Sequence, residues 1–410
     1  MTIHHGPKDS SRPLSGITVI DFSRVLAGPY CSMCLGDMGA DIIKIERPDG
    51  GDDTRRFGPP FLEGQSTYFM SINRNKRSIA LDLKHPDSKL IIHRLLETAD
   101  IVLENFRPGT MEKLGFGKRD CWDINPKLIY CSISAFGHRG TPEWSSKPGY
   151  DLILQGMGGI PSITGAPDGA PAKVGASIAD VVSGMNAFSG ILLALIGRSQ
   201  THEGQHVDIS MQEGQLALHT YLASAWLNAG VEPPRNGNRH LSIAPYSTYK
   251  AHDGWLNIAV ANQKLWGLFC AAIAKPELEH DPRFATNVDR VQHIDALDAV
   301  INEALGQNTL SHWIPLLSEH GIPAGPVLSI REALEHPQVS ARNSLVASSM
   351  NGGPNFKSVG PAFGINQESV PSSTAPKLGE NTVTILRESG FTSSEVEDFL
   401  KSKAAFSLQA

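Results

Sequence analysis

Short apolar runs alternate regularly with amphipathic stretches over residues 1–215, and this rhythm is the feature that most restricts the fold. The amphipathic stretches predict helices at 29–38 and 85–99. The apolar runs predict buried strands at 17–22, 41–46, 78–83, 101–104 and 128–132. Because strands that alternate with helices form parallel sheets, the sequence predicts an α/β fold with helices on both faces of a parallel sheet.

The composition changes where Pro233, Pro234, Gly237 and Pro245 cluster, which indicates a linker. Beyond it the pattern predicts a strand at 254–260 and helices at 263–274, 293–303 and 394–404. We therefore expect a large domain with its N-terminal part at 1–215, a linker at 216–245, a smaller α+β domain at 246–330, and a return segment at 331–410 that packs on the large domain.

Charge and cysteine content argue against several classes of partner. The net charge is −6 and no block of Lys and Arg could follow a phosphate backbone, so nucleic acid is not an expected partner. The five cysteines are odd in number and widely scattered, which predicts a reducing compartment such as the cytoplasm. The most apolar stretch, 181–197, contains three glycines, so we expect a buried helix there and no membrane partner.

Two short motifs are compatible with ordinary structural roles. Cys31 and Cys34 form a CxxC, but no second CxxC or nearby His pair completes a metal site, so two buried helix residues are expected. The run from His202 to His206 matches HExxH, which binds zinc only when it lies on a helix. Because Gly204 interrupts the run and a β-like segment follows, we expect a turn and predict no metal.

Three polar segments follow predicted strands, at 21–29, 43–55 and 104–115. The second and third bring cations and amides to the C-terminal edge of the sheet, where open α/β sheets bind ligands. The first opens a helix, whose N-terminus suits a phosphate or carboxylate. One such segment is typical of a solvated loop, whereas three together favour an anionic ligand. A fourth segment, 73–78, leads into a strand instead.

Asp180 is the only charged residue between Lys173 and Arg198, and it stands at the start of the apolar helix. A carboxylate in this position is often an N-cap, which satisfies backbone amides of the first turn. It is also a candidate nucleophile, because the helix dipole is expected to keep it ionised. The residues alone leave both roles open. No dinucleotide, P-loop or serine-hydrolase signature accompanies it in the sequence.

An ordered set of motifs resembles the family III CoA transferases over nearly the whole chain. The matching segments are DFSRVLAGP, KIERP, NRNKRS, ENFRPG with KLGF, GYD, IADVVSG and GIPAGPV, in this order. The stretch from Leu26 to Asp82 is most similar to the succinate–hydroxymethylglutarate CoA transferases.

This resemblance implies an interlocked homodimer, with a Rossmann-like large domain that binds CoA and a small domain that covers the acyl end. It implies that Asp180 is the nucleophile and that Tyr150 lies near the acyl group. Arg239 and His240 fall in the region that matches a glycine-rich loop of the family, and we expect them to contact substrate. CoA is then a substrate and product, with no tightly bound cofactor. The implied CoA-binding residues are Arg24, Ala27, Arg47, Leu81, Asp82, Leu83, Lys84, Asn105, Phe106, Arg107 and Lys113.

The implied chemistry suits a lone carboxylate. Asp180 attacks an acyl-CoA to form a mixed anhydride, and the released thiolate converts this to an aspartyl-CoA thioester. The acceptor acid reverses these steps, and the site must exclude water. The sequence does not name the acids. We expect a dicarboxylate such as succinate or glutarate, with four candidate arginines for its distal carboxylate: Arg24, Arg55, Arg74 and Arg239.

Three rival functions are weighed against this prediction. An α-methylacyl-CoA racemase has the same fold but needs two acid/base groups at the α-carbon, and family racemases have GHD where this chain has Gly149-Tyr150-Asp151. A tyrosine with a pKa of about 10 is a poor base near neutral pH. A non-catalytic acyl-CoA-binding protein would not need Asp180. A nicotinamide dehydrogenase is disfavoured by the missing glycine fingerprint.

Overall fold

The computed structural model describes residues 12–349, 355–365 and 373–408, and within these the chain forms two compact units. The first unit comprises the described residues of Met1–Gly158, Gly175–His219 and Ser340–Ala410. The second comprises Gly159–Val174 and Thr220–Val339. The segment Gly159–Val174 thus lies with the second unit, although the sequence analysis placed it in the large domain.

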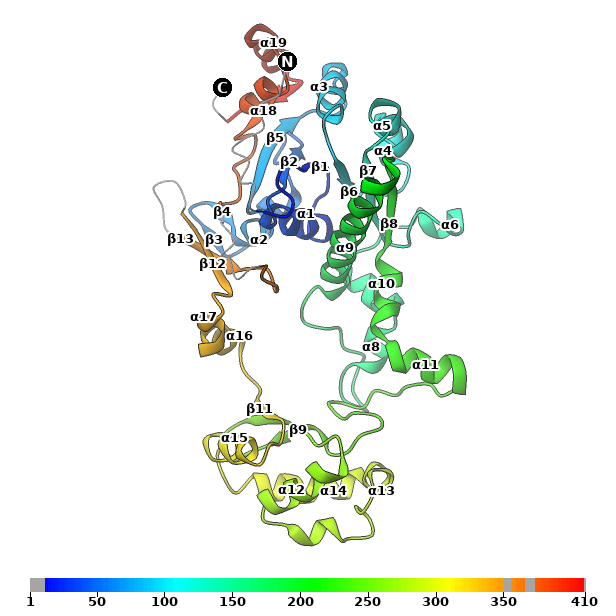
Figure 1. The fold of residues 1–410 in the computed structure, drawn as a ribbon, viewed down its shortest axis with the longest axis vertical. Coiled ribbons are helices and arrows are strands. Elements are labelled where there is room, and N and C mark those ends of the chain that lie inside the picture. The colour runs from blue at the N-terminus through cyan, green and yellow to red at the C-terminus, as the bar shows by residue number, and fades with distance from the viewer. Residues whose placement is uncertain (1–11, 350–354, 366–372, 409–410) are drawn as a thin grey trace. The chain divides into compact units, whose positions relative to one another are not determined.

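A seven-stranded sheet forms the centre of the first unit (Figure 1). Its strands, in spatial order, are β14 (Ala405–Phe406), β5 (Lys76–Leu81), β2 (Asp41–Glu46), β1 (Thr18–Asp21), β6 (Ile101–Glu104), β7 (Ile129–Ser134) and β8 (His206–Ser210). Only β14 is antiparallel to its neighbour. Apart from β14, the order is third, second, first, fourth, fifth, sixth, which is that of doubly wound dinucleotide-binding folds. The predicted α/β fold with a parallel sheet is confirmed.

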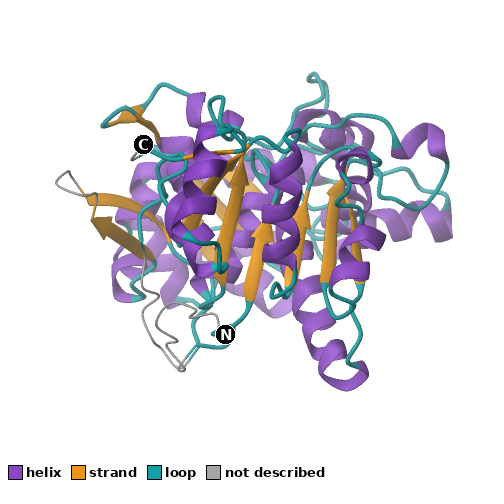
Figure 2. Cartoon of the chain, turned by 90° about the horizontal axis from the view of Figure 1, so that it is seen from above, coloured by secondary structure: helices purple, strands orange, loops and turns teal. Residues whose placement is uncertain are grey.

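Helices cover both faces of this sheet (Figure 2). On one face Ile20, Ile43 and Val102 pack with α3 (Pro86–Leu96), α4 (Thr110–Leu114), α5 (Lys118–Ile124), α18 (Thr382–Glu388) and α19 (Ser393–Lys401). On the other, Val19, Ile42 and Leu103 pack with α1 (Ala27–Asp37), α7 (Asp151–Met157), α9 (Ile178–Thr201) and α10 (Met211–Leu218). Successive residues of each strand point to opposite helix layers. Because both layers are buried, the strands must be apolar on both faces.

The remaining elements of the first unit are short. They are η1 (Asp53–Arg56), α2 (Thr67–Ser71), α6 (Pro142–Ser145), the β3–β4 hairpin (Phe61–Leu62 and Gln65–Ser66) and the β12–β13 pair (Leu345–Ser349 and Asn355–Val359). Helix α17 (Pro337–Ala341) lies at the boundary between the units. Strand β5 begins at Lys76, two residues before the predicted start. The polar Lys76 can occupy a buried strand position because its ammonium lies 3.4 Å from a carboxylate oxygen of Asp21.

Helix α9 is longer than the apolar stretch in the sequence, with 24 residues from Ile178 to Thr201. By length and composition it is the one helix of the described residues that could cross a membrane, which is weak support for a span. Only 33% of its apolar window is buried, so the expected buried helix is buried along one face. That face packs against α1, as Figure 1 shows. Met185, Leu193 and Ile196 on α9 are exposed.

The second unit is a small α+β structure around a three-stranded antiparallel sheet. The sheet order is β11 (Ala324–Pro326), β10 (Trp255–Ala259) and β9 (Tyr246–Lys250). Its core joins Tyr249, Leu256 and Ile258 with apolar residues of α12 and α14. Its helices are α8 (Ile160–Ile163), α11 (Thr220–Ala229), α12 (Gln263–Ala272), η2 (Pro276–Glu279), α13 (Asn287–Gln292), α14 (Ile294–Leu305), α15 (Leu310–Glu319) and α16 (Ile330–Glu335).

Candidate active site

The site is built at the point where the strand order of the large sheet reverses, between β1 and β6. The loop after β1 and the loop after β6 meet there, because the side chain of Asn105 clamps the backbone of Arg24. The amide of Arg24 donates to Asn105 Oδ1 at 2.8 Å, and Asn105 Nδ2 donates to the Arg24 carbonyl at 2.7 Å. Open α/β sheets bind their ligands in the crevice at such a reversal.

Two cavities open beside these loops. The Asp180 cavity has a volume of about 170 Å³, and its walls include Arg24, Ala27, Asn105, Arg107, Tyr150 and Asp180. The Arg47 cavity has a volume of about 210 Å³, and its walls include Arg47, Glu46, Asp52 and the run Leu81–Lys84. Arg24 and Phe106 line both cavities. The guanidinium of Arg24 lies 5.0 Å from the centre of the Phe106 ring, which favours a cation over that ring.

Asp180 lies in the first turn of α9 but is not its N-cap, which is Ser177. In the described residues no hydrogen bond or ion pair of its carboxylate is found. Burial, followed by the charge of Asp151, raises the pKa of Asp180 to about 7. The helix dipole was expected to keep this group ionised, and the loss of solvation acts in the opposite direction. Near neutral pH the carboxyl exchanges readily between its acid and its carboxylate form.

Asp151 supports the start of α9 from the neighbouring helix α7. Its Oδ1 accepts a hydrogen bond from the Ala179 amide at 2.8 Å, and its Oδ2 accepts from Gln155 Nε2 at 2.7 Å. Asp151 thus satisfies a first-turn amide of α9 directly beside Asp180, as an N-cap side chain would. Tyr68 is close enough to be affected by the charge of Asp180. Burial, followed by that charge, raises the pKa of the Tyr68 phenol to about 12.

One carboxylate at the wall of the Asp180 cavity, that of Asp53, faces three guanidinium groups. Its Oδ1 lies 2.5 Å from Arg47 Nη2 and 3.6 Å from Arg56 Nη2, and its Oδ2 lies 3.4 Å from Arg24 Nη1. All four side chains are partly exposed. Arginines that converge in this way suit an anionic group such as a phosphate, which binds guanidinium through charge-assisted hydrogen bonds.

Glu104 supports the second loop from below, at the end of β6. It is 2% exposed, and its Oε2 accepts a hydrogen bond from the Phe106 amide at 2.8 Å. Burial raises the pKa of Glu104 to about 7, although the Ser132 hydroxyl and the Phe106 amide oppose that shift. The conformation of Asn105 and Phe106 therefore depends on a carboxyl that is fully enclosed in protein.

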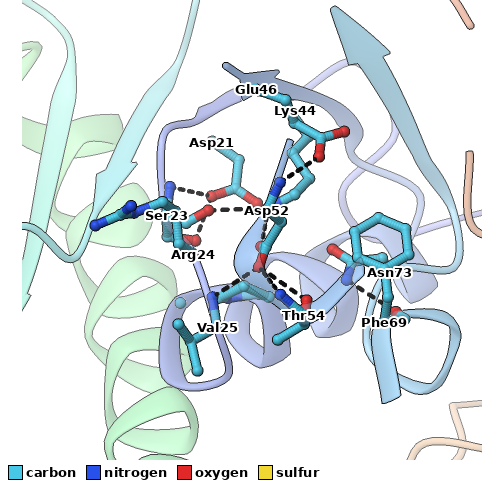
Figure 3. A network of polar contacts seen from close by, with 12 residues as sticks. Asp21, Ser23, Arg24, Val25, Lys44, Glu46, Asp52, Thr54, Phe69 and Asn73 are labelled. Carbon is cyan, nitrogen blue, oxygen red and sulfur yellow. Dashed lines mark hydrogen bonds and ion pairs between the residues drawn. The ribbon is translucent and has the colours of Figure 1, made fainter. Parts of the chain in front are cut away.

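A network of buried ions supports the loop after β1 (Figure 3). Lys44 Nζ lies 2.9 Å from Asp52 Oδ2 and donates at 2.9 Å to the Ser23 carbonyl. Asp21 is also fully buried, and it accepts hydrogen bonds from the amide and hydroxyl of Ser23. The Asp52 amide donates a hydrogen bond of 2.9 Å to Glu46 Oε2. The charge of Lys44 helps to hold the pKa of Asp52 at about 2, against the opposing effect of burial.

Comparison with known proteins assigns the chain to a family. The model of CoA-transferase family III matches residues 14–382. The chain belongs to CoA-transferase family III. The transferase is 42% identical over 343 residues to an acetyl-CoA:oxalate CoA-transferase of Acetobacter aceti, a match that covers 83% of this chain and 87% of the relative. It is 40% identical over 384 residues to a succinate–glutarate CoA-transferase of Agrobacterium fabrum, with 92% and 95% covered.

A solved structure has the same fold. A CAIB/BAIF family protein from Brucella suis superposes with a TM-score of 0.83 at 37% sequence identity, covering 92% of the transferase and 99% of that chain. Membership of the family makes the protein an enzyme that transfers CoA, as the motifs predicted.

Most of the predicted site residues of the transferase lie at the two cavities. The Asp180 cavity brings together Arg24, Ala27, Asn105, Phe106, Arg107, Tyr150 and Asp180, and the Arg47 cavity brings together Arg24, Arg47, Leu81, Asp82, Leu83, Lys84 and Phe106. Lys113 lines neither cavity, although Leu114 beside it lines the second. Arg239 and His240 belong to the second unit, where His240 stacks on Tyr221 with ring centres 5.5 Å apart. Their contact with substrate stays a prediction.

Four arginines were proposed to bind the distal carboxylate of a substrate. Three of them already pair with acidic side chains of the transferase. Arg55 binds Glu46 through two hydrogen bonds of 2.8 and 2.6 Å. The buried Arg74 binds Asp37 in the same manner, at 2.8 and 2.6 Å. Arg239 binds Asp298 at 2.7 Å and Asp295 at 2.8 Å. Of the four, Arg24 is the one that lines the Asp180 cavity.

The HExxH and CxxC runs can be located on the described elements. The HExxH run is a turn, because α9 ends at Thr201 and β8 begins at His206, so that interpretation is confirmed. Cys31 is buried and Cys34 half-buried on α1, and all five cysteines are free thiols. Burial raises the pKa of both thiols of the CxxC, that of Cys34 to about 12. Thiols of this kind are unreactive near neutral pH.

Sequence reasoning missed the acids that accompany the catalytic candidates. Asp151 lies in the GYD motif, but no local signal shows that it reaches the start of a helix 28 positions further along the chain. Asp52 and Asp53 are adjacent in the sequence and look alike, yet Asp52 is 1% exposed and pairs with Lys44, whereas Asp53 is partly exposed and faces Arg24 and Arg47. Tyr68 lies in the Leu26–Asp82 stretch that carries the resemblance, but no site role was predicted for it. Only the tertiary arrangement distinguishes these residues from ordinary loop acids and aromatics.

Proposed function

We propose that the transferase moves CoA between carboxylic acids through a covalent intermediate on Asp180. One observation carries the proposal. Asp180 has no hydrogen-bond or ion-pair partner in the described residues, and it lines the same cavity as Arg24 and Asn105 of the predicted CoA loops. A half-buried carboxyl without a partner costs stability, and such groups are concentrated at functional sites.

The proposed reaction has four steps that need no external reagent. An oxygen of Asp180 attacks the acyl-CoA carbonyl, forming a mixed anhydride and releasing the CoA thiolate. The thiolate attacks the Asp180 carbonyl carbon, which gives an aspartyl-CoA thioester and frees the donor acid. An acceptor carboxylate attacks this thioester, and the thiolate then attacks the acceptor carbonyl of the new anhydride. Asp180 returns with one oxygen that came from the acceptor.

We further propose that the Arg47 cavity holds the nucleotide end of CoA and the Asp180 cavity its thioester end. Arg47 and Lys84 bring positive charge to the first cavity, and Arg24 lies on the wall shared with the second. CoA carries phosphate groups at its nucleotide end alone, so the cationic cavity suits that end. The assignment of individual CoA contacts to Ala27, Leu81–Lys84, Asn105–Arg107 and Lys113 stays a prediction. CoA serves as substrate and product in this scheme, without a tightly bound cofactor.

For the acids we propose a dicarboxylate. The relatives named above act, by their names, on oxalate or on succinate and glutarate. Arg24 is the proposed partner of the second carboxylate, because its side chain is 41% exposed and its ion pair to Asp53 is long, at 3.4 Å. Succinyl-CoA is our first candidate donor and glutarate our first candidate acceptor. We propose that Tyr150, which is 71% exposed and lines the Asp180 cavity, contacts the acyl chain.

We also propose that the working enzyme is an interlocked homodimer in a reducing compartment such as the cytoplasm. The exposed apolar residues Met185, Leu193 and Ile196 follow one face of α9, and Trp226 and Leu227 are exposed on α11. Large exposed apolar surfaces mark interfaces in soluble proteins. Five free cysteines are in keeping with a reducing environment.

A panel of acyl-CoA donors and acids, read by mass spectrometry, tests the proposed function. We expect succinyl-CoA with a dicarboxylate to give the new acyl-CoA, and Asp180→Asn to abolish transfer while CoA still binds. An active Asp180→Asn enzyme would contradict the covalent role. Incubation of an (R)-2-methylacyl-CoA in deuterated buffer without an acceptor tests the racemase alternative, because α-deuterium exchange would replace our proposal with that one.

A further inference from the structure

Val25 has a backbone conformation that its side chain disfavours. Its φ angle is 68°, in the left-handed region, and its amino acid is β-branched. A branched side chain in that region clashes with its own backbone, so the conformation persists only where the surroundings impose it. Val25 also lines the Asp180 cavity, directly between Arg24 and the start of α1. A strained residue at this position calls for an explanation in terms of the site.

The residue that holds Val25 is Asp52 (Figure 3). Asp52 Oδ1 accepts a hydrogen bond from the Val25 amide at 3.3 Å, and the same oxygen accepts from the amide and hydroxyl of Thr54 at 3.0 and 2.8 Å. The other oxygen, Oδ2, is paired with Lys44 at 2.9 Å. The side chains of Asp52 and Lys44 are both completely buried. The position of Asp52 is therefore fixed by contacts on both oxygens.

The residues before Val25 are held as well. Lys44 binds the carbonyl of Ser23, and Asn105 binds the amide and carbonyl of Arg24. Three consecutive residues are thus each held by a different side chain from another part of the chain. Of these contacts, only that of Asp52 acts on the strained residue itself.

The turn at Val25 determines where α1 begins. Helix α1 starts at Ala27, two residues later, and its N-cap Leu26 offers no side-chain hydrogen bond. The start of α1 packs tightly against α9, because a Cβ atom on Gly184 would lie 2.6 Å from the Ala27 carbonyl oxygen. Gly184 is one helical turn beyond Asp180 and on the same face of α9. A shift of the loop that Asp52 holds would therefore be passed directly to the helix that carries the nucleophile.

We propose that Asp52 is a positioning residue for CoA transfer. It holds Val25 in the left-handed conformation and so sets the wall of the Asp180 cavity against which the thioester lies. This inference rests on the proposed function, because the cavity is assigned there to acyl-CoA. This role can be distinguished from a general effect on stability. A neutral side chain at position 52 that accepts the hydrogen bond of the Val25 amide can perform it, whereas a buried alanine cannot.

Two charge-balanced double variants test this role. Lys44→Met with Asp52→Asn removes the ion pair but keeps an oxygen for the Val25 amide, and Lys44→Met with Asp52→Ala removes both. Both variants lose Lys44, which also binds the Ser23 carbonyl, so the asparagine variant is the reference for the alanine variant. Relative to the asparagine variant, we expect the alanine variant to lose roughly tenfold or more in kcat/KM for acyl-CoA, with an equal KM for the acceptor acid. Thr54→Val, which removes a different donor to the same oxygen, is the control and should stay close to wild type.

A third variant separates position from folding. Glycine adopts the left-handed region without strain, so adding Val25→Gly to the alanine variant should restore CoA binding and part of the transfer rate. Equal losses in the two double variants, or an alanine variant as active as the asparagine one, would overturn the proposal. If the alanine variant does not fold, the glycine triple variant must fold and bind CoA, and its failure overturns the proposal too. Loss of the proposed function itself would appear differently, as a wild-type enzyme that transfers CoA without an Asp180 adduct.

Discussion

Replacing Asp180 with asparagine should make the transferase more stable while abolishing transfer, and the gain should depend on pH. The reason is the raised pKa of about 7, which burial and Asp151 produce. In the unfolded chain an aspartate has a pKa near 3.9, so the folded state binds the proton more tightly than the unfolded state does. Between these two values stability falls as pH rises, and above pH 7 the full cost of ionising Asp180 is present.

The magnitude follows from the difference in pKa. Ionisation of Asp180 in the folded state costs up to about 4 kcal/mol above pH 7, and partial solvation of this half-buried group reduces that figure. Asparagine has a similar shape but no charge, so Asp180→Asn should recover about 1–4 kcal/mol at pH 8 and close to nothing near pH 4. For unfolding of a unit of this size, such a gain corresponds to a melting temperature raised by roughly 2–7 °C.

Thermal unfolding of both proteins across this pH range, with and without CoA, is the assay. Asp123→Asn, which neutralises an exposed acid on α5, is the control and should show no pH-dependent difference from wild type. A melting-temperature difference between Asp180→Asn and wild type that stays constant from pH 5 to pH 8 would refute the reasoning. So would a variant less stable than wild type at pH 8, since Asp180 would then have a stabilising partner.

Three further substitutions probe the same site. Asp151→Asn keeps the oxygen that binds the Ala179 amide but removes a neighbouring charge, so the pKa of Asp180 should fall and the acid limb of the pH profile of kcat/KM should move to lower pH; an unchanged limb would contradict the coupling. Asp53→Asn removes the carboxylate that faces Arg24 and Arg47, so CoA should bind about two- to fivefold more tightly at low salt, with a smaller gain at high salt. Titration calorimetry measures this affinity. Weaker binding would mean that Asp53 organises the arginines instead of competing with the ligand. Glu104→Gln keeps an acceptor for the Phe106 amide but cannot ionise, so its melting temperature should exceed that of wild type at pH 8 and approach it near pH 4.5. A lower value at pH 8 would show that the charge of Glu104 is needed.

The strand pattern could be predicted well because it depends on local apolar runs. The predicted strands at 41–46 and 101–104 coincide with β2 and β6 in the structure. The prediction failed at the start of β5, where Lys76 is polar but buried, since a tertiary contact with Asp21 makes a charged residue acceptable in a strand. Hydrophobic periodicity cannot reveal such a compensated charge.

The site could be predicted in its residues but not in its electrostatics. Asp180 stood out as a lone charge in an apolar helix, and it does line a cavity with Arg24 and Tyr150. Its raised pKa was not foreseen, because it depends on burial and on Asp151, which another helix brings close. The four arginines looked equivalent in the sequence, and the structure distinguishes them by their partners. Arg55 and Arg74 are already bound to Glu46 and Asp37.

The left-handed conformation of Val25 had no sequence signal at all. Valine is among the residues least suited to it, so a reading of local preferences predicts an ordinary extended or helical residue there. The contact from Asp52 that imposes the conformation comes from a loop 27 positions away in the chain.

The transfer of oxygen from the acceptor acid to Asp180 tests the central claim most directly. The enzyme would be turned over with an acyl-CoA and an acceptor whose carboxylate oxygens are isotopically labelled, then digested and read by peptide mass spectrometry. The account predicts one labelled oxygen in the peptide that carries Asp180 and, after further turnover, label in the released donor acid. Transfer of CoA with an unlabelled Asp180 peptide would contradict it, because CoA would then pass between the acids without a covalent bond to this residue.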